Sequence, residues 1–389
     1  MRRNLWNEDY TPDPNAGFAR WVLAFGTFGV PQAAAPIAFS LLALSLTGSA
    51  DHGSWVVLAM TLAQIAGAVP VARAGRGHPL VRYTRLLMIV RTGALLAATV
   101  LAAAGAPLWA IALAAGCAGL VNGAAHGCLR AGLTHLIGPG RIPRALGLGA
   151  TLNEVTFASS PVIVSVIGAY SPVAAIAAIA VLGTVPLFLV PSVQAPPATA
   201  STVSSRTLLR PGILLWLFCC LATSASTAGV EVGAVSLALR FSLAPAAGAL
   251  FALVRCLASV SGGLWVTARN RQAQPRAVIA YLLGTSVGAV LVWGGWTLVT
   301  TLVGAVLIGF FIPVLGTHYS LVLDRLAPPQ LRAEAFSLLR TASAVGVIAT
   351  SGVLAIAGLG WALGVCAGLV VVATVLVAVS GRRPPNTSA

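Results

Sequence analysis

Long apolar stretches follow one another along almost the whole chain, and they restrict its fold more than any other feature. A helix needs about 20 mostly apolar residues to cross a bilayer, and counting on that basis predicts twelve spans. The predicted ranges are 18–46, 54–72, 84–104, 107–129, 145–168, 171–190, 211–240, 244–267, 276–293, 296–320, 336–358 and 360–380. We therefore expect an all-α polytopic membrane protein.

The composition agrees with this fold class and excludes several functions. Apolar residues make up 58% of the chain and charged residues 8%, whereas about 25% of a soluble domain is charged. All 23 basic residues are arginine, so the chain has no P-loop lysine and no Schiff-base lysine. The six cysteines form no C-x-x-C pair and have no histidine cluster beside them, so neither a metal site nor a cofactor is expected.

The distribution of arginine predicts the orientation in the membrane. With the N-terminus inside, nineteen arginines fall in cytoplasmic segments and only Arg240 in an outer connection, as the positive-inside rule requires. We expect a multi-pass protein of the cell membrane with both termini in the cytoplasm. The net charge of +15 is dispersed over short loops, a pattern that does not indicate nucleic-acid binding.

The spans divide into two sets of six. We predict a cytoplasmic tail (1–17), a first six-helix bundle (18–190), a linker rich in Pro, Ala, Ser and Thr (191–210), a second bundle (211–380) and a short tail (381–389). Arg144 and Arg332 each follow a proline-containing turn and begin an apolar helix, and they lie 188 residues apart. Matching positions in two halves indicate an internal duplication, which is common in secondary transporters.

On these features the chain resembles the major facilitator superfamily. The loop after the second span retains Arg73, Gly75 and Arg76 of that family's motif, with Ala72 in place of the usual Asp. The resemblance implies two pseudo-symmetric bundles that alternate access to a central cavity. It also implies a cytoplasmic gate formed by Arg73, Gly75, Arg76, Arg144 and Arg332.

The fifth span retains part of the signature that resembles those of antiporters. Gly147, Ser160 and Pro161 match it, while Thr156, Val164 and Ser165 replace glycines. Small residues still allow close helix packing, which favours export. Several segments are also similar to uncharacterised permeases and exporters of the actinobacterial type.

Two carboxylates, Glu231 and Glu154, lie inside spans, where an unpaired charge is costly. Glu231 precedes the turn near Ser242 by 11 residues and Arg255 follows it by 13, so the two lie at similar depth on neighbouring helices. They form either a static ion pair or a protonatable site whose pairing changes during transport.

Glu154 lies ten residues after Arg144. Arg130 or His126 of the fourth span could face it, although Arg130 could instead extend its side chain to the cytoplasmic surface. Arg91 and Arg340 also lie within spans, and we expect them to extend to the surface or to bind lipid headgroups.

Uncharged polar residues near the middle of the spans are candidates for substrate contact. The candidates are Gln32, Gln64, Asn122 and Asn153. Gln32 and Asn122 are better candidates than Gln64, because the resemblance implies that spans one and four line the cavity. His318 and Tyr319 of span ten could contact substrate or the inner gate. Each of these residues could equally be a polar contact between helices.

The function that fits these features is secondary active transport by alternating access. The chain lacks a nucleotide-binding motif, so we expect protons to drive the movement of a small lipophilic or amphipathic molecule, by efflux through antiport. The alternatives are proton-coupled uptake of a metabolite and a non-transporting receptor or assembly factor. We expect a monomer in the lipid bilayer that is not an enzyme.

Overall fold

A computed structural model describes residues 14–49, 52–192, 204–244, 247–271 and 273–380, and within these ranges the chain is helical with no strands. The predicted tails (1–17 and 381–389) and linker (191–210) fall largely or wholly outside these ranges. The α-helices are α1 (Pro14–Thr27), α2 (Val30–Thr47), α3 (His52–Ala74), α4 (Leu80–Ala103), α5 (Leu108–Leu136), α6 (Ile142–Tyr170), α7 (Pro172–Leu182), α8 (Val185–Leu189), α9 (Pro211–Val232), α10 (Ala234–Arg240), α11 (Gly248–Arg269), α12 (Pro275–Gly294), α13 (Leu298–Leu326) and α14 (Arg332–Ser380).

The helices reproduce the predicted spans. Eleven segments of the described residues are long and apolar enough to cross a bilayer, and the last of them, Pro329–Ser380, is 52 residues long. It contains a break at Gly358, where φ is 82°, a value that only glycine adopts without strain. Helix α14 is therefore two spans joined at Gly358, and the polytopic all-α prediction is confirmed.

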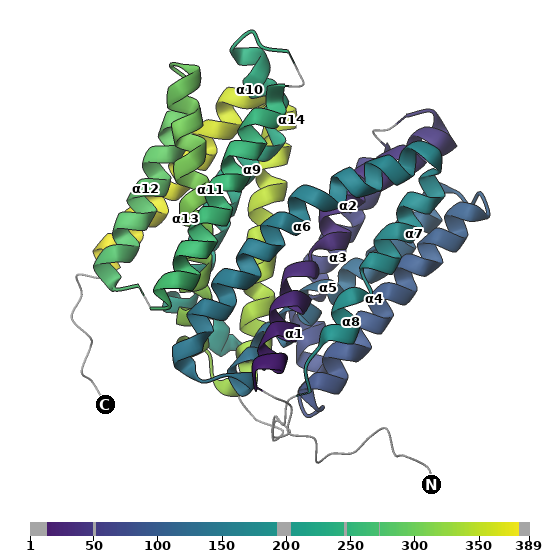
Figure 1. The fold of residues 1–389 in the computed structure, drawn as a ribbon, viewed down its shortest axis with the longest axis horizontal. Helices are drawn as coiled ribbons and strands as arrows, with labels where there is room; N and C mark the ends of the chain where they lie inside the picture. The colour runs from purple at the N-terminus through teal and green to yellow at the C-terminus, as the bar shows by residue number, and fades with distance from the viewer. Residues whose placement is uncertain (1–13, 50–51, 193–203, 245–246, 272, 381–389) are drawn as a thin grey trace.

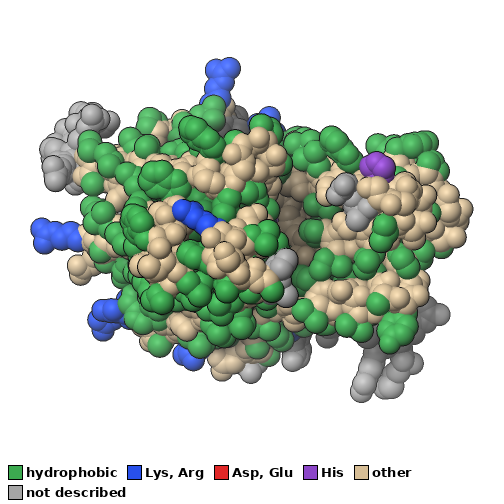
Figure 2. All heavy atoms as spheres, turned by 90° about the horizontal axis from the view of Figure 1, so that it is seen from above, with side chains coloured by type: hydrophobic (Ala, Val, Ile, Leu, Met, Phe, Trp, Pro, Cys, Tyr) green, Lys and Arg blue, Asp and Glu red, His purple; other side chains and the backbone are tan. Residues whose placement is uncertain are grey.

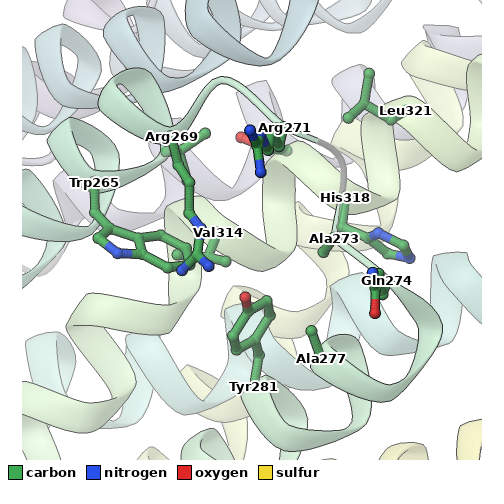
Figure 3. Close-up of a pocket in the computed structure, with 12 residues that line it drawn as sticks. Trp265, Arg269, Arg271, Ala273, Gln274, Ala277, Tyr281, Val314, His318 and Leu321 are labelled. Carbon is green, nitrogen blue, oxygen red and sulfur yellow. The ribbon is translucent and has the colours of Figure 1, made fainter.

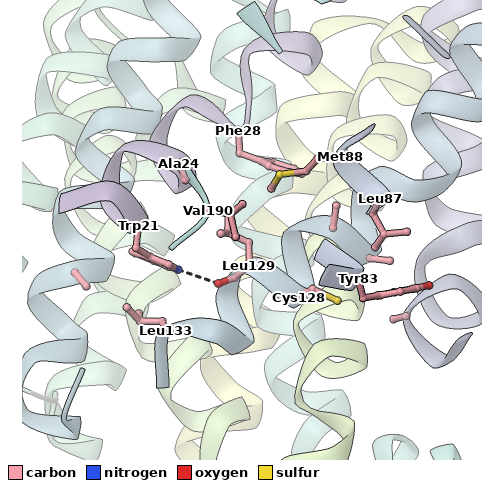
Figure 4. Packing of buried hydrophobic residues seen from close by; sticks show 14 of the residues in the cluster. Trp21, Ala24, Phe28, Tyr83, Leu87, Met88, Cys128, Leu129, Leu133 and Val190 are labelled. Atoms are coloured by element: carbon pink, nitrogen blue, oxygen red, sulfur yellow. Dashed lines mark hydrogen bonds between the residues drawn. The ribbon is translucent and has the colours of Figure 1, made fainter. Parts of the chain in front are cut away.

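The chain forms two helical bundles, α1–α8 and α9–α14, which are seen side by side in Figure 1. Each has its own apolar cores of mainly small and branched side chains. In the first bundle Trp21 of α1 is buried, and its Nε1 donates a hydrogen bond of 2.8 Å to the Leu129 carbonyl of α5 (Figure 4). This bond satisfies the one polar group that the indole brings into the core.

The two bundles meet at the lower end of Figure 1, where α5 joins α6 and α13 joins α14. We call this end the base. Helix α5 packs on α14 and α6 packs on α11, and glycine makes the close approach possible. A Cβ on Gly127 would lie 2.3 Å from the Ala333 carbonyl oxygen, and one on Gly147 would lie 2.8 Å from the Gly263 carbonyl oxygen.

Away from the base the bundles diverge. Figure 1 shows α2 and α10 far apart at the upper end, and Figure 2, seen from that end, shows the surface hollowed between the two bodies. The molecule is therefore closed at the base and open at the opposite end.

Candidate functional site

A cavity of about 210 Å³ lies between the two bundles, above the base. Helices α1, α5 and α6 of the first bundle and α13 and α14 of the second supply its walls. Most of the lining is apolar. The residues around it are Phe25, His126, Arg130, Leu146, Ala150, Asn153, Glu154, Ile312, Pro313, Gly316, Thr317, Ser320, Phe336, Leu339 and Arg340.

Arg255 of α11 joins the two bundles at this site. Its Nη2 lies 2.5 Å from Glu231 Oε1 of α9 and 3.2 Å from Glu154 Oε2 of α6. The arginine side chain is 4% exposed, Glu154 is 14% exposed and Glu231 is 40% exposed. The structure thus brings Glu231 and Arg255 together, as their similar depth predicted. It also adds the carboxylate of Glu154 from the other bundle.

The expected pairing of Glu154 with Arg130 or His126 is wrong, because α6 packs on α11 and turns Glu154 toward Arg255. Arg130 Nε instead donates to Ser320 Oγ at 2.5 Å. The His126 ring packs against the rings of Phe25 and Phe28. Both residues still line the same cavity as Glu154.

A chain of polar side chains crosses the first bundle beside the cavity. The Asn122 side-chain nitrogen donates to Gln64 Oε1 at 2.7 Å, and Gln32 donates to the same oxygen at 2.5 Å. Gln32 in turn accepts a hydrogen bond from Arg340 of the second bundle. Gln64 and Asn122 are buried, and none of the three amides lines the cavity. Their predicted place in its wall is wrong, and the hydrogen bonds agree with the alternative prediction of polar contacts between helices.

Arg91 and Arg340 do not extend to the surface. Arg91 is 1% exposed and donates three hydrogen bonds, to the Phe28 and Gly183 carbonyls and to Asn122 Oδ1. Arg340 lines the central cavity. Arg340 lies eight residues after the start of α14, which is about 12 Å of helix. That depth is the sequence signal that argued against a surface position.

The remaining candidates fall in three places. Asn153 lines the central cavity, and Tyr319 is buried against Trp216. His318 lines a second pocket, of about 270 Å³, formed by α11, α12 and α13 with Trp265, Arg269 and Tyr281 (Figure 3). His318 and Tyr319 therefore lie outside the wall of the central cavity.

The residues of the predicted gate lie at the base. Arg76 Nη2 is 2.5 Å from Glu334 Oε1 of the second bundle, whose side chain is buried. Arg73 is exposed, and Gly75 packs close to the Tyr83 ring. Sequence reasoning missed Glu334, although its place beside Arg332 in the repeated motif was available as a signal.

The two repeated arginines have different contacts. The Arg144 backbone N–H donates to Asn270 Oδ1 at 3.0 Å, which joins α6 to the end of α11. Arg332 Nε lies 3.4 Å from Asp324 Oδ1 within the second bundle. Of these two contacts, the hydrogen bond of Arg144 joins the bundles, and the ion pair of Arg332 lies within one bundle.

The chain shares its fold with several solved structures of transporters and transporter homologues. The chain aligns with a bacterial homologue of the iron transporter ferroportin in an outward-facing state (TM-score 0.77, 16% identity, 95% of this chain and 99% of that chain). It also aligns with the human organic anion transporter MFSD10 (0.70, 14%, 94% and 98%) and with the E. coli fucose:proton symporter (0.68, 12%, 92% and 98%). No curated protein sequence matches the chain significantly.

The family itself follows from the sequence match. The model of the Major Facilitator Superfamily matches residues 18–351, which covers eleven of the predicted spans in whole or in part. Members of this family are secondary transporters of small molecules rather than enzymes. The chain belongs to the Major Facilitator Superfamily and is a multi-pass membrane transporter.

Proposed function

We propose that the chain is a proton-coupled transporter that exports a small amphipathic molecule by antiport. One observation carries the proposal: Arg255 of the second bundle contacts a carboxylate from each bundle, and one of the two, Glu154, lines the central cavity. Ionisable groups inside membrane spans are costly unless they are used or paired. Here a single cation is shared by two carboxylates, so one of them can lose its charge while the other keeps the arginine paired.

The contact between Glu154 and Arg255 connects the protonation of one residue to the relative position of the bundles. When Glu154 is ionised, its charge holds α6 against α11 through Arg255. When Glu154 is protonated, this attraction is lost and Arg255 remains with Glu231 of its own bundle. Proton binding would thus weaken a link between the bundles and favour their rearrangement, as alternating access requires.

The proposed direction, export, rests on two features. The small residues of α6 match part of an antiporter-like signature, and the arginine distribution gives the orientation in the membrane. We place the base in the cytoplasm, because most arginines of the predicted loops fall there. The structure is then open to the outside, where a proton can reach Glu231, whose side chain is 40% exposed. The mostly apolar lining of the cavity fits a substrate with an apolar body.

Transport in proteoliposomes with an imposed pH gradient tests this proposal. Antiport predicts that a substrate accumulates in vesicles with an acidic lumen, whereas symport predicts accumulation in vesicles with an alkaline lumen. The probes are 1-naphthalenesulfonate, 1-naphthalenesulfonamide and 1-naphthyltrimethylammonium, which share one ring system and differ in charge. We expect E154Q and E231Q to lose the gradient dependence and E8Q, in the N-terminal tail, to retain it.

Two results would contradict the proposal. Full gradient dependence in both E154Q and E231Q would remove these carboxylates from proton coupling. Absence of any gradient-driven flux from correctly folded wild-type protein, for probes that bind, would favour a non-transporting receptor instead.

A further inference from the structure

The charges around the central cavity do not cancel. Arg130 and Arg340 line it as cations, and Glu154 is the only acid in the lining. Glu154 and Glu231 share Arg255, so when all three are ionised they leave one negative charge against the two positive ones. A positive excess therefore remains around the cavity, which attracts an opposite charge.

Arg130 is the centre of this excess. It is 2% exposed, its Nε donates to Ser320 Oγ, and its guanidinium carbon lies 4.4 Å from the centroid of the Phe336 ring. Within the part of the chain that the structure describes, neither Nη1 nor Nη2 has a hydrogen-bond partner. A buried arginine with both terminal nitrogens unpaired is costly, and an anionic ligand would supply the missing acceptors.

The acids nearest to Arg130 are already paired. Asp324 and Arg332 both act electrostatically on Arg130, with opposite signs, and these two residues contact each other at 3.4 Å. Arg255 also has unpaired nitrogens, Nε and Nη1, but two carboxylates oppose its charge. Arg130 differs because no acid contacts it among the described residues.

The lining of the cavity also suits an amphipathic ligand. Phe25, Ile312 and Phe336 offer apolar surface beside the charged end, and His126 and Asn153 add polar groups. His126 Nδ1 has no partner among the described residues. A volume of about 210 Å³ admits a small ring system that carries one acidic group.

We infer that the substrate is an amphipathic organic anion whose carboxylate, sulfonate or phosphate is held by Arg130, with Arg340 contributing a second positive charge. Planar guanidinium donors match such oxyanions in geometry. That this anion is transported rests on the proposed function. Its binding at Arg130 does not depend on the direction of transport, which the gradient experiment determines.

Titration of the purified full-length chain with the three naphthalene probes tests the inference. We expect 1-naphthalenesulfonate to bind and to raise the melting temperature, and we expect the sulfonamide and the trimethylammonium compound to bind at least about tenfold more weakly. In R130Q the sulfonate affinity should fall about tenfold, while R130K, which keeps the charge, should lose less. R340Q should show a smaller loss, because Arg340 donates to Gln32 as well.

The matched control is R276Q, which removes one positive charge from an exposed position at the start of α12. Its sulfonate affinity should equal that of the wild type. Equal binding of all three probes, an undiminished sulfonate affinity in folded R130Q and R130K, or no sulfonate binding at all would each overturn the inference. Gradient-driven flux of the neutral or cationic probe alone would overturn this inference and leave the proposed function standing.

Discussion

Two buried arginines of the first bundle show how similar burial can serve different purposes. Arg91 is 1% exposed and Arg130 is 2% exposed, and each lies over a phenylalanine ring, Phe28 and Phe336 respectively. Both terminal nitrogens of Arg91 are bonded to oxygens of its own bundle. Those of Arg130 are buried and not bonded within the described residues, and the residue itself lines the cavity between the bundles.

Burial alone therefore does not distinguish a structural arginine from one that binds a ligand. The hydrogen-bond partners of the guanidinium group make the distinction. The oxygens around Arg91 bond both of its terminal nitrogens without a carboxylate and leave only Nε without a partner among the described residues, so most of its cost is met when the first bundle folds. The cost of Arg130 is not met by the protein alone. A site that is left incomplete in this way binds a complementary anion in preference to other molecules.

The largest effect should come from the Arg91 region. R91Q removes three hydrogen bonds from the interior of one bundle and leaves Asn122 Oδ1 without its donor. We expect a loss of about 3–5 kcal/mol in stability, measured as a lower melting temperature and a lower folded yield in size-exclusion chromatography. A folded R91Q with wild-type stability would show that Arg91 does not stabilise the first bundle, and would contradict the contrast with Arg130.

The second effect tests the contact between the bundles next to Arg130. In G127A the new Cβ would lie 2.3 Å from the Ala333 carbonyl oxygen, so the closed base should be disfavoured by about 1–3 kcal/mol. Spin labels at positions 82 and 276, which are exposed, would report a longer distance across the base in a cysteine-free background. An unchanged distance would show that the base does not depend on this close approach.

The third effect should separate stability from binding at Arg130. R130Q removes a buried charge that has no acidic partner, so we expect a melting temperature equal to or above that of the wild type. The affinity for 1-naphthalenesulfonate should nevertheless fall about tenfold, which corresponds to 1.4 kcal/mol. A large loss of stability in R130Q would place Arg130 in the same structural class as Arg91.

The smallest effect concerns the orientation of Arg130. S320A removes the acceptor of its Nε hydrogen bond and should reduce sulfonate affinity by a few fold, since such a bond contributes about 1 kcal/mol. Binding calorimetry against S337A, at the base contact with the Ala68 carbonyl, provides the comparison. Equal losses in both variants would indicate a general loosening of the base.

The fold could be predicted because its main determinant is local. Each apolar stretch specifies one span regardless of its neighbours, and the pair of Glu231 and Arg255 followed from depth on two consecutive helices. The third member, Glu154, could not be placed, since its contact depends on how α6 of one bundle packs on α11 of the other. Gln32 and Asn122 were misplaced for the same reason: helical position gives depth, whereas the direction of a side chain depends on tertiary packing.

We propose that the two carboxylates that share Arg255 couple proton movement to transport of an anion bound in the central cavity. Gradient-driven transport of 1-naphthalenesulfonate by the wild type, E154Q and R130Q tests this most directly. The account predicts accumulation in acid-lumen vesicles by the wild type, little accumulation by R130Q because binding is weak, and loss of gradient dependence in E154Q with binding retained. Accumulation by E154Q that follows the pH gradient as it does in the wild type would contradict the claim.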